Sequence, residues 1–370
     1  MVFLTLNKFT ALFTAKSVSR YFLSLYLLLA YFILPVSGFG QNALTAEARW
    51  TGRIAFYNVE NFFDIDTDST RDYNAFAPEG EQHWDLGRFL KKKNNVFKVL
   101  MAIGEGDPPA MVGLCEVENE SVLLSLIYQT PLKNFDYQFV HYESEDRRGI
   151  DVAIIYRKEL LELLTSAVFR VRDQEDASFI TRDILYASFK ACGEDTLHVF
   201  VNHWPSRYGG ELATTEKRML AATILRSKVD SIRRVFQGAK VLIMGDFNDT
   251  PGDISLTEGL KAMPEGLLTG NNELVNLFSD IKALGYKGTI KHLNNWQVFD
   301  QIIVSVAFLN AGDNLVLKPN SQRIFAPDFL LVPDEKYLDK MLFRTYIGPR
   351  YVGGYSDHLP VYVDVGCATD

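Results

Sequence analysis

Short apolar segments separated by polar turns run through most of this chain. Continuous apolar runs of this kind indicate buried strands, suited to a sheet that a second sheet covers on one face and helices flank. The predicted strands are Ile54–Val59, Met111–Val117, Tyr137–Tyr142, Val152–Tyr156, Ala167–Val171, Ile184–Phe189, Leu197–Asn202, Val241–Met244, Phe299–Val304 and Val361–Val365.

Two longer segments between these runs carry the apolar repeat of a helix. One begins after Asp85, a possible N-cap, and its apolar face consists of Phe89, Leu90, Phe97, Leu100 and Ile103. The other covers residues 211–235, and its basic residues are expected to face solvent rather than nucleic acid. These basic residues are Lys217, Arg218, Arg226, Lys228, Arg233 and Arg234.

Many strands with a few interspersed helices predict an α/β fold, a sandwich of two sheets with helices on the outside. From Arg53 on, the sequence has no low-complexity segment, long linker or fixed-period repeat. We therefore expect residues 41–370 to form a single domain.

Residues 1–40 have a different character. Lys8, Lys16 and Arg20 precede an almost wholly apolar stretch, Tyr21 to Val36, and small residues follow before Gln41. This order is typical of a secretory signal peptide, so we expect export to the periplasm or the medium. The stretch is short for a spanning helix, although an uncleaved anchor stays open, and no stable membrane span is expected in the mature chain.

The overall charge limits the choice of partner. The 370 residues carry a net charge of −8, and the first 40 hold three basic and no acidic residues, which leaves −11 on the mature chain. Such a charge argues against tight non-specific coating of nucleic acid, but not against a nuclease with a metal ion and a few arginines. Three cysteines allow at most one internal disulfide, and Cys115 lies in an apolar run as a small core residue.

Several of the predicted strands run directly into a polar side chain. Asn58, Glu116 and His203 end three of them, Asp246 and Asn248 follow a fourth, and Asp357 and His358 precede the last. Each has an ordinary explanation when taken alone: an exposed strand end, a structural histidine or an Asx turn. Taken together, polar groups at the tips of adjacent strands can converge on one site, which metal-assisted hydrolysis of phosphate esters requires.

Two further segments bear on this chemistry. Asp300 interrupts an apolar run, and a charge in a core strand usually has a partner, for which His358 is the candidate. Arg147 is interpreted as part of a polar turn, while Arg207 and Tyr208 either touch a substrate phosphate or only close a loop.

The ordered set of motifs resembles the endonuclease/exonuclease/phosphatase family, whose members include DNase I, exonuclease III, neutral sphingomyelinases and inositol polyphosphate 5-phosphatases. Each block is short, but together they span residues 53–365. The blocks are Asn58-Val59-Glu60-Asn61, Glu116-Val117-Glu118-Asn119, Arg148-Gly149-Ile150-Asp151-Val152-Ala153, Asn202-His203, Gly245-Asp246-Phe247-Asn248, Phe299-Asp300-Gln301 and Ser356-Asp357-His358.

The resemblance implies a four-layer α/β/β/α sandwich of two mainly antiparallel sheets, with the site at one mouth. It implies that Glu116 binds Mg²⁺, or Mn²⁺ or Ca²⁺ in its place, and that Asn58 and Asp357 shape the metal site. It also makes Asp246 the group that orients or deprotonates the attacking water.

The same resemblance assigns the remaining residues. Asn248 would contact the phosphate, His358 would pair with Asp300, and His203 would be the second histidine. Asn202, Arg148 and Asp151 are expected on the substrate side, with Asp151 also orienting His203. Phe299 and Gln301 depart from the residues that often flank this aspartate, so a ligand role for either is in doubt.

The function that these residues predict is an exported, monomeric, Mg²⁺-dependent nuclease that cleaves nucleic acid or another phosphodiester by direct attack of water. One alternative is a phosphatase or a phospholipase C-type enzyme, for which an exposed aromatic hairpin would be expected within 325–332 or 337–351. A second alternative is a non-catalytic binding domain, against which the complete set of site residues argues. The fold cannot separate these alternatives, because loops decide the substrate.

Overall fold

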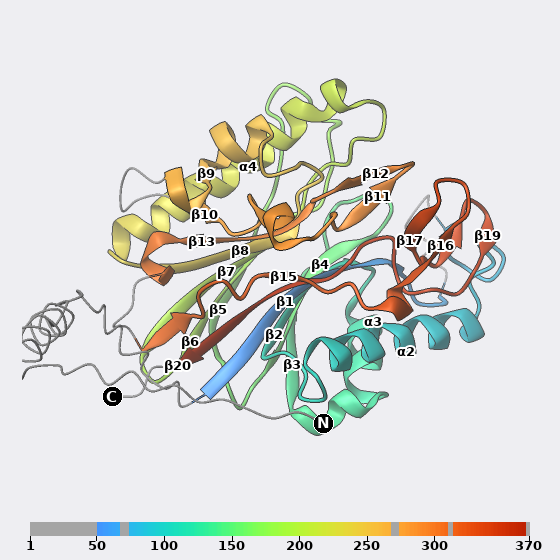
Figure 1. Cartoon of the computed structure of the whole chain (residues 1–370), viewed down its shortest axis with the longest axis horizontal. Coiled ribbons are helices and arrows are strands. Elements are labelled where there is room, and N and C mark those ends of the chain that lie inside the picture. The colour runs from blue at the N-terminus through green and yellow to red at the C-terminus, as the bar shows by residue number, and fades with distance from the viewer. Residues whose placement is uncertain (1–49, 67–73, 268–273, 310–313, 368–370) are drawn as a thin grey trace, which may run out of the picture. The chain divides into compact units, whose positions relative to one another are not determined.

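Most of the predicted strands pair into two seven-stranded sheets in the computed structural model, which describes residues 50–66, 74–267, 274–309 and 314–367 (Figure 1). The first sheet has the order β14-β20-β1-β2-β4-β3, and β15 also pairs with β20. Its strands are β1 (Trp50–Phe62), β2 (Met111–Val117), β3 (Tyr137–His141), β4 (Asp151–Arg157), β14 (Leu315–Leu317), β15 (Arg323–Ile324) and β20 (Val361–Cys367).

The second sheet has the order β5-β6-β7-β8-β13-β10-β9. Neighbouring strands are antiparallel in both sheets, except that β1 with β2, β7 with β8, and β9 with β10 are parallel. Its strands are β5 (Glu162–Phe169), β6 (Ile184–Ala191), β7 (Asp195–His203), β8 (Lys240–Asp246), β9 (Ala262–Met263), β10 (Leu274–Asn276) and β13 (Asp300–Ser305).

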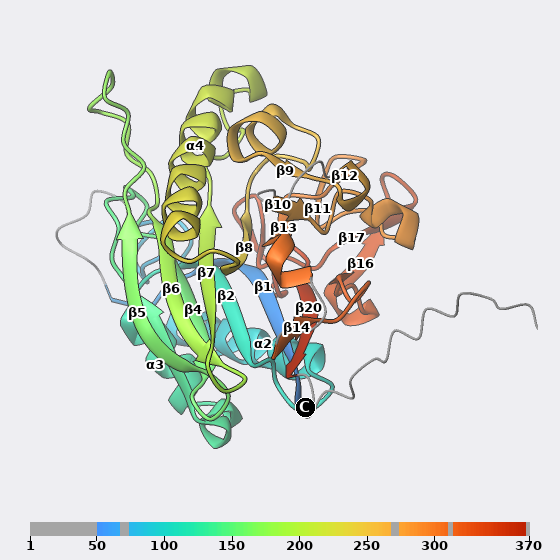
Figure 2. The same ribbon diagram turned by 90° about the vertical axis from the view of Figure 1, so that its left-hand side faces the viewer.

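Helices cover the outer faces of the two sheets. α2 (Leu86–Ile103) and α3 (Glu120–Tyr128) lie on the side of the first sheet, and α4 (Glu211–Val235) lies along the second (Figure 2). Apolar side chains of both sheets pack between them as the main core, because each apolar face must be buried against another layer. The α/β sandwich predicted from the sequence is therefore confirmed.

Helix α2 begins where its cap predicts. The side chain of Asp85 accepts a hydrogen bond from the backbone N–H of Arg88 at 2.9 Å. One predicted core position is wrong: Leu90 is exposed, whereas Lys92 is buried. The buried ammonium of Lys92 is stabilised because it donates to Thr345 Oγ1 at 2.6 Å and to the Tyr355 carbonyl at 2.7 Å.

Helix α4 begins and ends where predicted. One of its basic residues, Arg218, does not face solvent, which corrects the prediction. Arg218 is fully buried. Its charge is stabilised there, because the guanidinium donates to Thr214 Oγ1 at 2.7 Å and lies 2.8 Å from Asp249 Oδ2. This arginine therefore anchors α4 to the loop after β8, close to the predicted site.

Several elements differ from the sequence prediction. β5 starts at Glu162, five residues before the predicted strand, because none of its residues is fully buried, and such an edge strand gives no continuous apolar run. Helix α3 and three small hairpins were not predicted, since they are short and lack a clear repeat. The hairpins are β11 (Ile290–His292) with β12 (Asn295–Gln297), β16 (Leu331–Asp334) with β17 (Asp339–Leu342), and β18 (Tyr346–Ile347) with β19 (Arg350–Tyr351).

A disulfide joins the two sheets. Cys192, just after β6, pairs with Cys367 at the end of β20, with the two Cα atoms 5.2 Å apart and a sequence separation of 175. Cys115 is a free, buried thiol, as expected for a core residue. The structure thus uses the one disulfide that three cysteines allow.

The predicted signal peptide, 1–40, lies outside the described residues, and its boundary stays a prediction. Residues Glu47–Asp370 group as one unit. None of the helices within the described ranges is both long and apolar enough to cross a membrane.

Removing the disulfide should destabilise the protein. The double variant Cys192→Ser/Cys367→Ser should lose about 2–4 kcal/mol of unfolding free energy, because the crosslink limits the unfolded chain over a long loop. Urea denaturation with and without reductant measures this loss. The double variant is the control, and reductant should leave its denaturation midpoint unchanged. An unchanged midpoint of the wild-type protein, with its disulfide shown to be reduced, would contradict the prediction.

Acid should also destabilise the fold through His198 on β7. Burial lowers the pKa of His198 from its ordinary 6.5 to about 4, so the unfolded chain takes up this proton at a higher pH than the folded one. Stability is thus fully present above pH 6.5 and is lost as the pH falls toward 4, by about 2–3 kcal/mol. Urea denaturation at pH 7 and pH 4.5 should show a smaller loss for His198→Gln than for wild type, and an unchanged loss for the exposed control His292→Gln.

Candidate active site

Strand direction brings the predicted site residues to one edge of the sandwich. β1 and β2 run parallel, as do β7 and β8, so the ends that carry Asn58, Glu116, His203 and Asp246 meet there. β13 is antiparallel to β8 and begins at the same edge, with Asp300 directly opposite Asp246 in the register. Residues from both sheets therefore form one cluster.

His358 and Asp300 form a hydrogen-bonded pair, as the sequence predicted. His358 Nδ1 lies 2.8 Å from Asp300 Oδ2, and both side chains are buried. Burial opposes a charge on His358, but the carboxylates of Asp300 and Asp246 outweigh it and raise the pKa of the imidazole well above its ordinary value. At neutral pH this imidazole is therefore a cation, with Nε2 3.7 Å from Asp246 Oδ2.

Asp246 lies at the centre of the cluster. Its Oδ2 accepts a hydrogen bond from Asn58 Nδ2 at 3.1 Å, and its Oδ1 accepts one from the backbone N–H of Asn248 at 3.0 Å. Burial raises the pKa of Asp246 to about 6, while the charge of His358 and these hydrogen bonds limit the rise. A carboxylate with this pKa can accept a proton near neutral pH.

His203 contacts the same carboxylate from the other side. Its Nε2 lies 3.6 Å from Asp246 Oδ2 and 3.9 Å from Glu116 Oε1. Burial, followed by the positive charges of Arg182, Arg148 and His358, lowers the pKa of His203 well below its ordinary value. The two imidazoles thus differ in charge at neutral pH: His358 is protonated and His203 is neutral.

Glu116 has the backbone of a constrained position. Its φ of +62° lies in the left-handed region, which costs energy for a residue with a side chain. The backbone N–H of Asn61 donates to Oε2 at 2.8 Å and holds the carboxylate beside the histidine. A rigid carboxylate near further acids fits one hard divalent cation, which usually takes one or two carboxylates and several waters.

The other two predicted metal residues have different surroundings. The Asn58 oxygen accepts the backbone N–H of Glu60 at 2.9 Å, and its nitrogen faces Asp246, so its amide positions the cluster. Asp357 Oδ2 accepts from Arg344 at 2.7 Å. Asp246, Asp300 and His358 also have ligand atoms within 4.8 Å of one another, but the short bond between His358 and Asp300 makes these two a hydrogen-bonded pair. Glu116 therefore stays the candidate ligand of a cation.

Sequence reasoning missed a charged group near Glu116, next to Asn61 in the chain. Glu60 is buried with φ +52°, and its carboxylate accepts the backbone N–H of Thr345 at 2.6 Å and lies 3.3 Å from Arg344. Burial, then repulsion by Asp357, raises the pKa of Glu60 to about 7, whereas burial lowers that of Lys92 to about 8. Glu60 stands inside the motif near the end of β1, so an acid following an apolar run was the available signal.

Asn248 and Asn202 serve partly as supports. Asn248 Nδ2 donates to the Trp204 carbonyl at 3.0 Å, and Asn202 is wholly buried between that tryptophan and β8. The close approach also explains Gly245: a Cβ there would lie 2.5 Å from the Asn202 carbonyl oxygen. Glycine is thus required by strand packing at this position rather than only by the exit turn.

The remaining predicted residues are more distant from the cluster. Asp151 contacts His141 and Ser144, and no contact with His203 is found among the described residues. Arg148 is 42% exposed and close enough for its charge to act on His203. Arg207 binds the loop after β8, through the Asn248 carbonyl at 2.8 Å and Asp253 at 2.6 Å, so it closes that loop.

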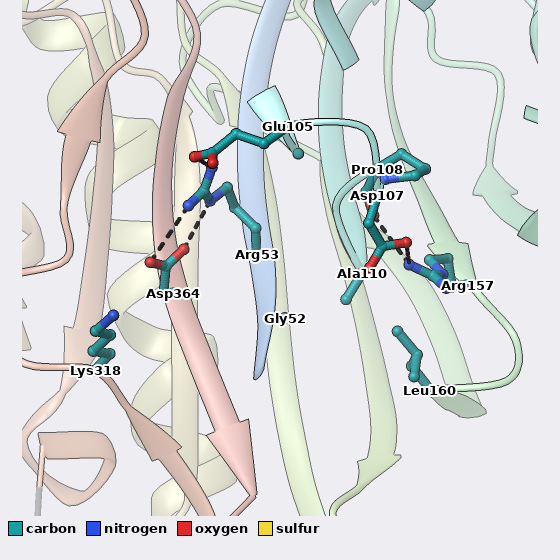
Figure 3. A pocket seen from close by; sticks show the side chains of 11 residues that line it. Gly52, Arg53, Glu105, Asp107, Pro108, Ala110, Arg157, Leu160, Lys318 and Asp364 are labelled. Atoms are coloured by element: carbon teal, nitrogen blue, oxygen red, sulfur yellow. Dashed lines mark hydrogen bonds and ion pairs between the residues drawn. The ribbon is translucent and has the colours of Figure 1, made fainter. Parts of the chain in front are cut away.

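A hollow lies at the other end of β1, about 17 Å along the strand from Asn58. Its two arginines are paired with acids: Arg53 with Asp364 at 2.7 Å, and Arg157 with Asp107 at 2.6 Å (Figure 3). These paired groups do not converge on a ligand position, unlike those around Asp246.

The contact between Asn58 and Asp246 supplies a direct test of the cluster. Asn58→Asp would put two buried carboxylates in contact, and we expect a loss of about 3 kcal/mol of unfolding free energy in the absence of metal. Chemical denaturation at pH 7.5 with chelator measures it, with the exposed Asn295→Asp as the control. Equal midpoints for the two variants would show that the two side chains are not in contact.

The structure resembles solved structures of low sequence identity. It matches a mannosyl-6-phosphatase from Bacteroides thetaiotaomicron with 15% identity and a TM-score of 0.52, over 85% of this chain and 99% of that one. It also matches D. rerio TDP2 complexed with a single-strand DNA product, with 16% identity and a TM-score of 0.51, over 85% and 99% of the two chains. At these identities the likeness shows the fold.

The sequence comparisons identify the family. No curated protein matches the chain. A family model matches residues 53–366, a range that contains every element of the cluster. The chain therefore belongs to the endonuclease/exonuclease/phosphatase family.

Proposed function

We propose that this protein is a Mg²⁺-dependent phosphodiester hydrolase that cleaves nucleic acid by direct attack of water. The observation that carries the proposal is the Asp246 carboxylate, held 3.6 Å and 3.7 Å from two imidazoles, one of which Asp300 orients. This places a proton acceptor and two possible phosphate ligands within one small volume, as hydrolysis of a phosphate ester requires.

Each residue has a role in this reaction. Asp246 orients the attacking water and accepts its proton as the new P–O bond forms and the ester P–O bond breaks. The cationic His358 and the neutral His203 stabilise negative charge on the phosphoryl oxygens. The side-chain amide of Asn248 lies at the same edge of the sandwich and would contact the phosphate. The leaving alkoxide takes up a proton from water, and no covalent enzyme intermediate forms.

Glu116 would hold the Mg²⁺, with Asp357 and Asn58 next to it. A bound Mg²⁺ polarises the phosphate and stabilises charge on the leaving oxygen. The buried and partly buried acids around Glu116 leave negative charge there, which a divalent cation would offset; Mn²⁺ or Ca²⁺ could replace it.

Groups at the rim support a nucleic acid as substrate. Arg344 bonds to Glu60 near the end of β1, and Arg148 precedes β4, so the two arginines flank β2 and its Glu116 in the order of the first sheet. Both are partly exposed, at 43% and 42%, and can contact phosphates of a longer substrate. Tyr208, in the loop after His203, is 93% exposed and offers a ring on which a base can stack.

A phosphomonoester is the second candidate. One structural neighbour is a mannosyl-6-phosphatase, and a net charge of −8 suits a small substrate better than a long polyanion. A lipid substrate has less support, because the segments expected to form a membrane hairpin expose one aromatic ring, that of Phe329 at 39%, and bury another. Tyr346 is buried and contacts the rings of Trp84, Phe76 and Tyr351.

Export is part of the proposal. The disulfide between Cys192 and Cys367 supports it, since disulfides persist mainly in oxidising compartments. The basic and then apolar order of residues 1–36 supports it from the sequence.

The proposed reaction is tested with purified residues 41–370 on supercoiled plasmid, single-stranded DNA and RNA oligonucleotides, and p-nitrophenyl phosphate. Glu116→Gln and His358→Ala should each lower the rate by about 100-fold or more without unfolding, because each removes charge stabilisation in the transition state. Glu216→Gln, an exposed acid on α4, is the matched control for Glu116→Gln.

Mg²⁺-dependent cleavage of nucleic acid that requires Glu116 and His358 would establish the proposal. Turnover of only the monoester would replace it with a phosphatase. A folded Glu116→Gln protein with full activity would remove this residue from the mechanism, and no turnover of any substrate would favour a binding domain.

A further inference from the structure

A second cluster of polar groups lies at the end of β3 and the start of β4, one strand away from Glu116. His141 Nε2 and Asp151 Oδ2 face each other here, and their side chains are only 4% and 2% exposed. Neither atom has a hydrogen-bond partner among the residues that the structure describes. Two buried polar atoms of this kind are costly, so each needs a partner that the protein chain does not supply.

The pair does not behave as an ordinary ion pair. His141 Nε2 and Asp151 Oδ2 are 3.5 Å apart, whereas a charge-assisted N–H···O bond is about 2.7–2.9 Å long. The His358–Asp300 pair in the same protein, at 2.8 Å, shows the shorter contact. The longer separation fits two ligands of one ion, because two atoms each about 2.1 Å from a tetrahedral metal lie about 3.4 Å apart.

The carboxylate of Asp151 is held in one orientation. Its Oδ1 accepts the backbone N–H of Ser144 at 3.0 Å, which fixes the plane of the carboxylate and directs Oδ2 at the imidazole. Outer contacts of this type normally orient metal ligands. A carboxylate oxygen of Glu143 completes the group, since the three ligand atoms lie within 4.8 Å of one another.

We propose that His141, Glu143 and Asp151 bind a second divalent cation of the zinc class. One imidazole nitrogen and two carboxylate oxygens, with water in the fourth position, are a usual donor set for Zn²⁺. The imidazole disfavours Mg²⁺ and Ca²⁺, which prefer oxygen ligands alone. This site shares no ligand with the one at Glu116 and does not depend on the proposed reaction.

The position suggests what the ion does. His141 ends β3 and Asp151 begins β4, so the ion would close the base of the loop 142–150, which carries Arg148 toward His203. Asp151 pairs with Val117, the residue after Glu116, so the loop and the catalytic edge share one strand pair. The cation would thus hold Arg148 at the rim.

Zinc binding to the folded protein tests this site. Glu116→Gln protein, freed of metal with chelator, is titrated calorimetrically with Zn²⁺ and, separately, with Co²⁺, whose visible spectrum reports its ligands. Adding His141→Ala or Asp151→Asn to the Glu116→Gln protein should remove one equivalent of bound Zn²⁺ or weaken its affinity by about 10-fold or more. Glu145→Gln, an exposed acid of the same loop, is the matched control and should leave binding unchanged.

Limited trypsin digestion gives a second measurement, because Arg147 and Arg148 lie in the loop. Zn²⁺ should slow cleavage there in the Glu116→Gln protein, but not after His141→Ala. Should either substitution unfold the chain, Glu143→Gln on the exposed ligand replaces it. Equal zinc stoichiometry and affinity with and without these residues, or cleavage that ignores Zn²⁺, would overturn the site.

Discussion

The contact between Asn58 and Asp246 is the constraint on which the rest of the site depends. Asn58 comes from the first sheet and Asp246 from the second, and their 3.1 Å hydrogen bond is wholly buried. A carboxylate in such a place is tolerated only when donors and a cation surround it, which here are Asn58, the Asn248 backbone and His358. The packing of the two sheets and the chemistry of the edge are therefore linked.

The charged neighbours of the two buried histidines give them opposite properties. The carboxylates of Asp300 and Asp246 overcome burial at His358 and keep it protonated, whereas burial and nearby arginines keep His203 neutral. Neighbouring charged side chains thus set the protonation of both histidines. Glu60 and Arg344 form a further ion pair, and the charge of Lys92 acts on Glu60.

Much of the fold and part of the site could be predicted from the sequence. Apolar runs placed most strands, and a carboxylate interrupting such a run correctly paired Asp300 with His358, because a buried charge requires a partner. The prediction failed where a buried charge stands among exposed residues of the same type: Arg218 was assigned to solvent with the other basic residues of α4, yet it is buried against Asp249. The short hairpins were not predicted, because strands of two to four residues are too short to show a periodic apolar pattern.

By itself the sequence determined the family, the succession of strands and the polar residue types at their ends, since these depend on local apolar pattern and ordered motifs. Only the tertiary structure decided how the polar groups pair. It turned Asp151 toward His141, tied Arg207 to the loop after β8 and paired Glu60 with Arg344. The physical reason is that strand pairing and sheet packing bring residues from distant parts of the chain within hydrogen-bond distance, and no local pattern encodes those distances.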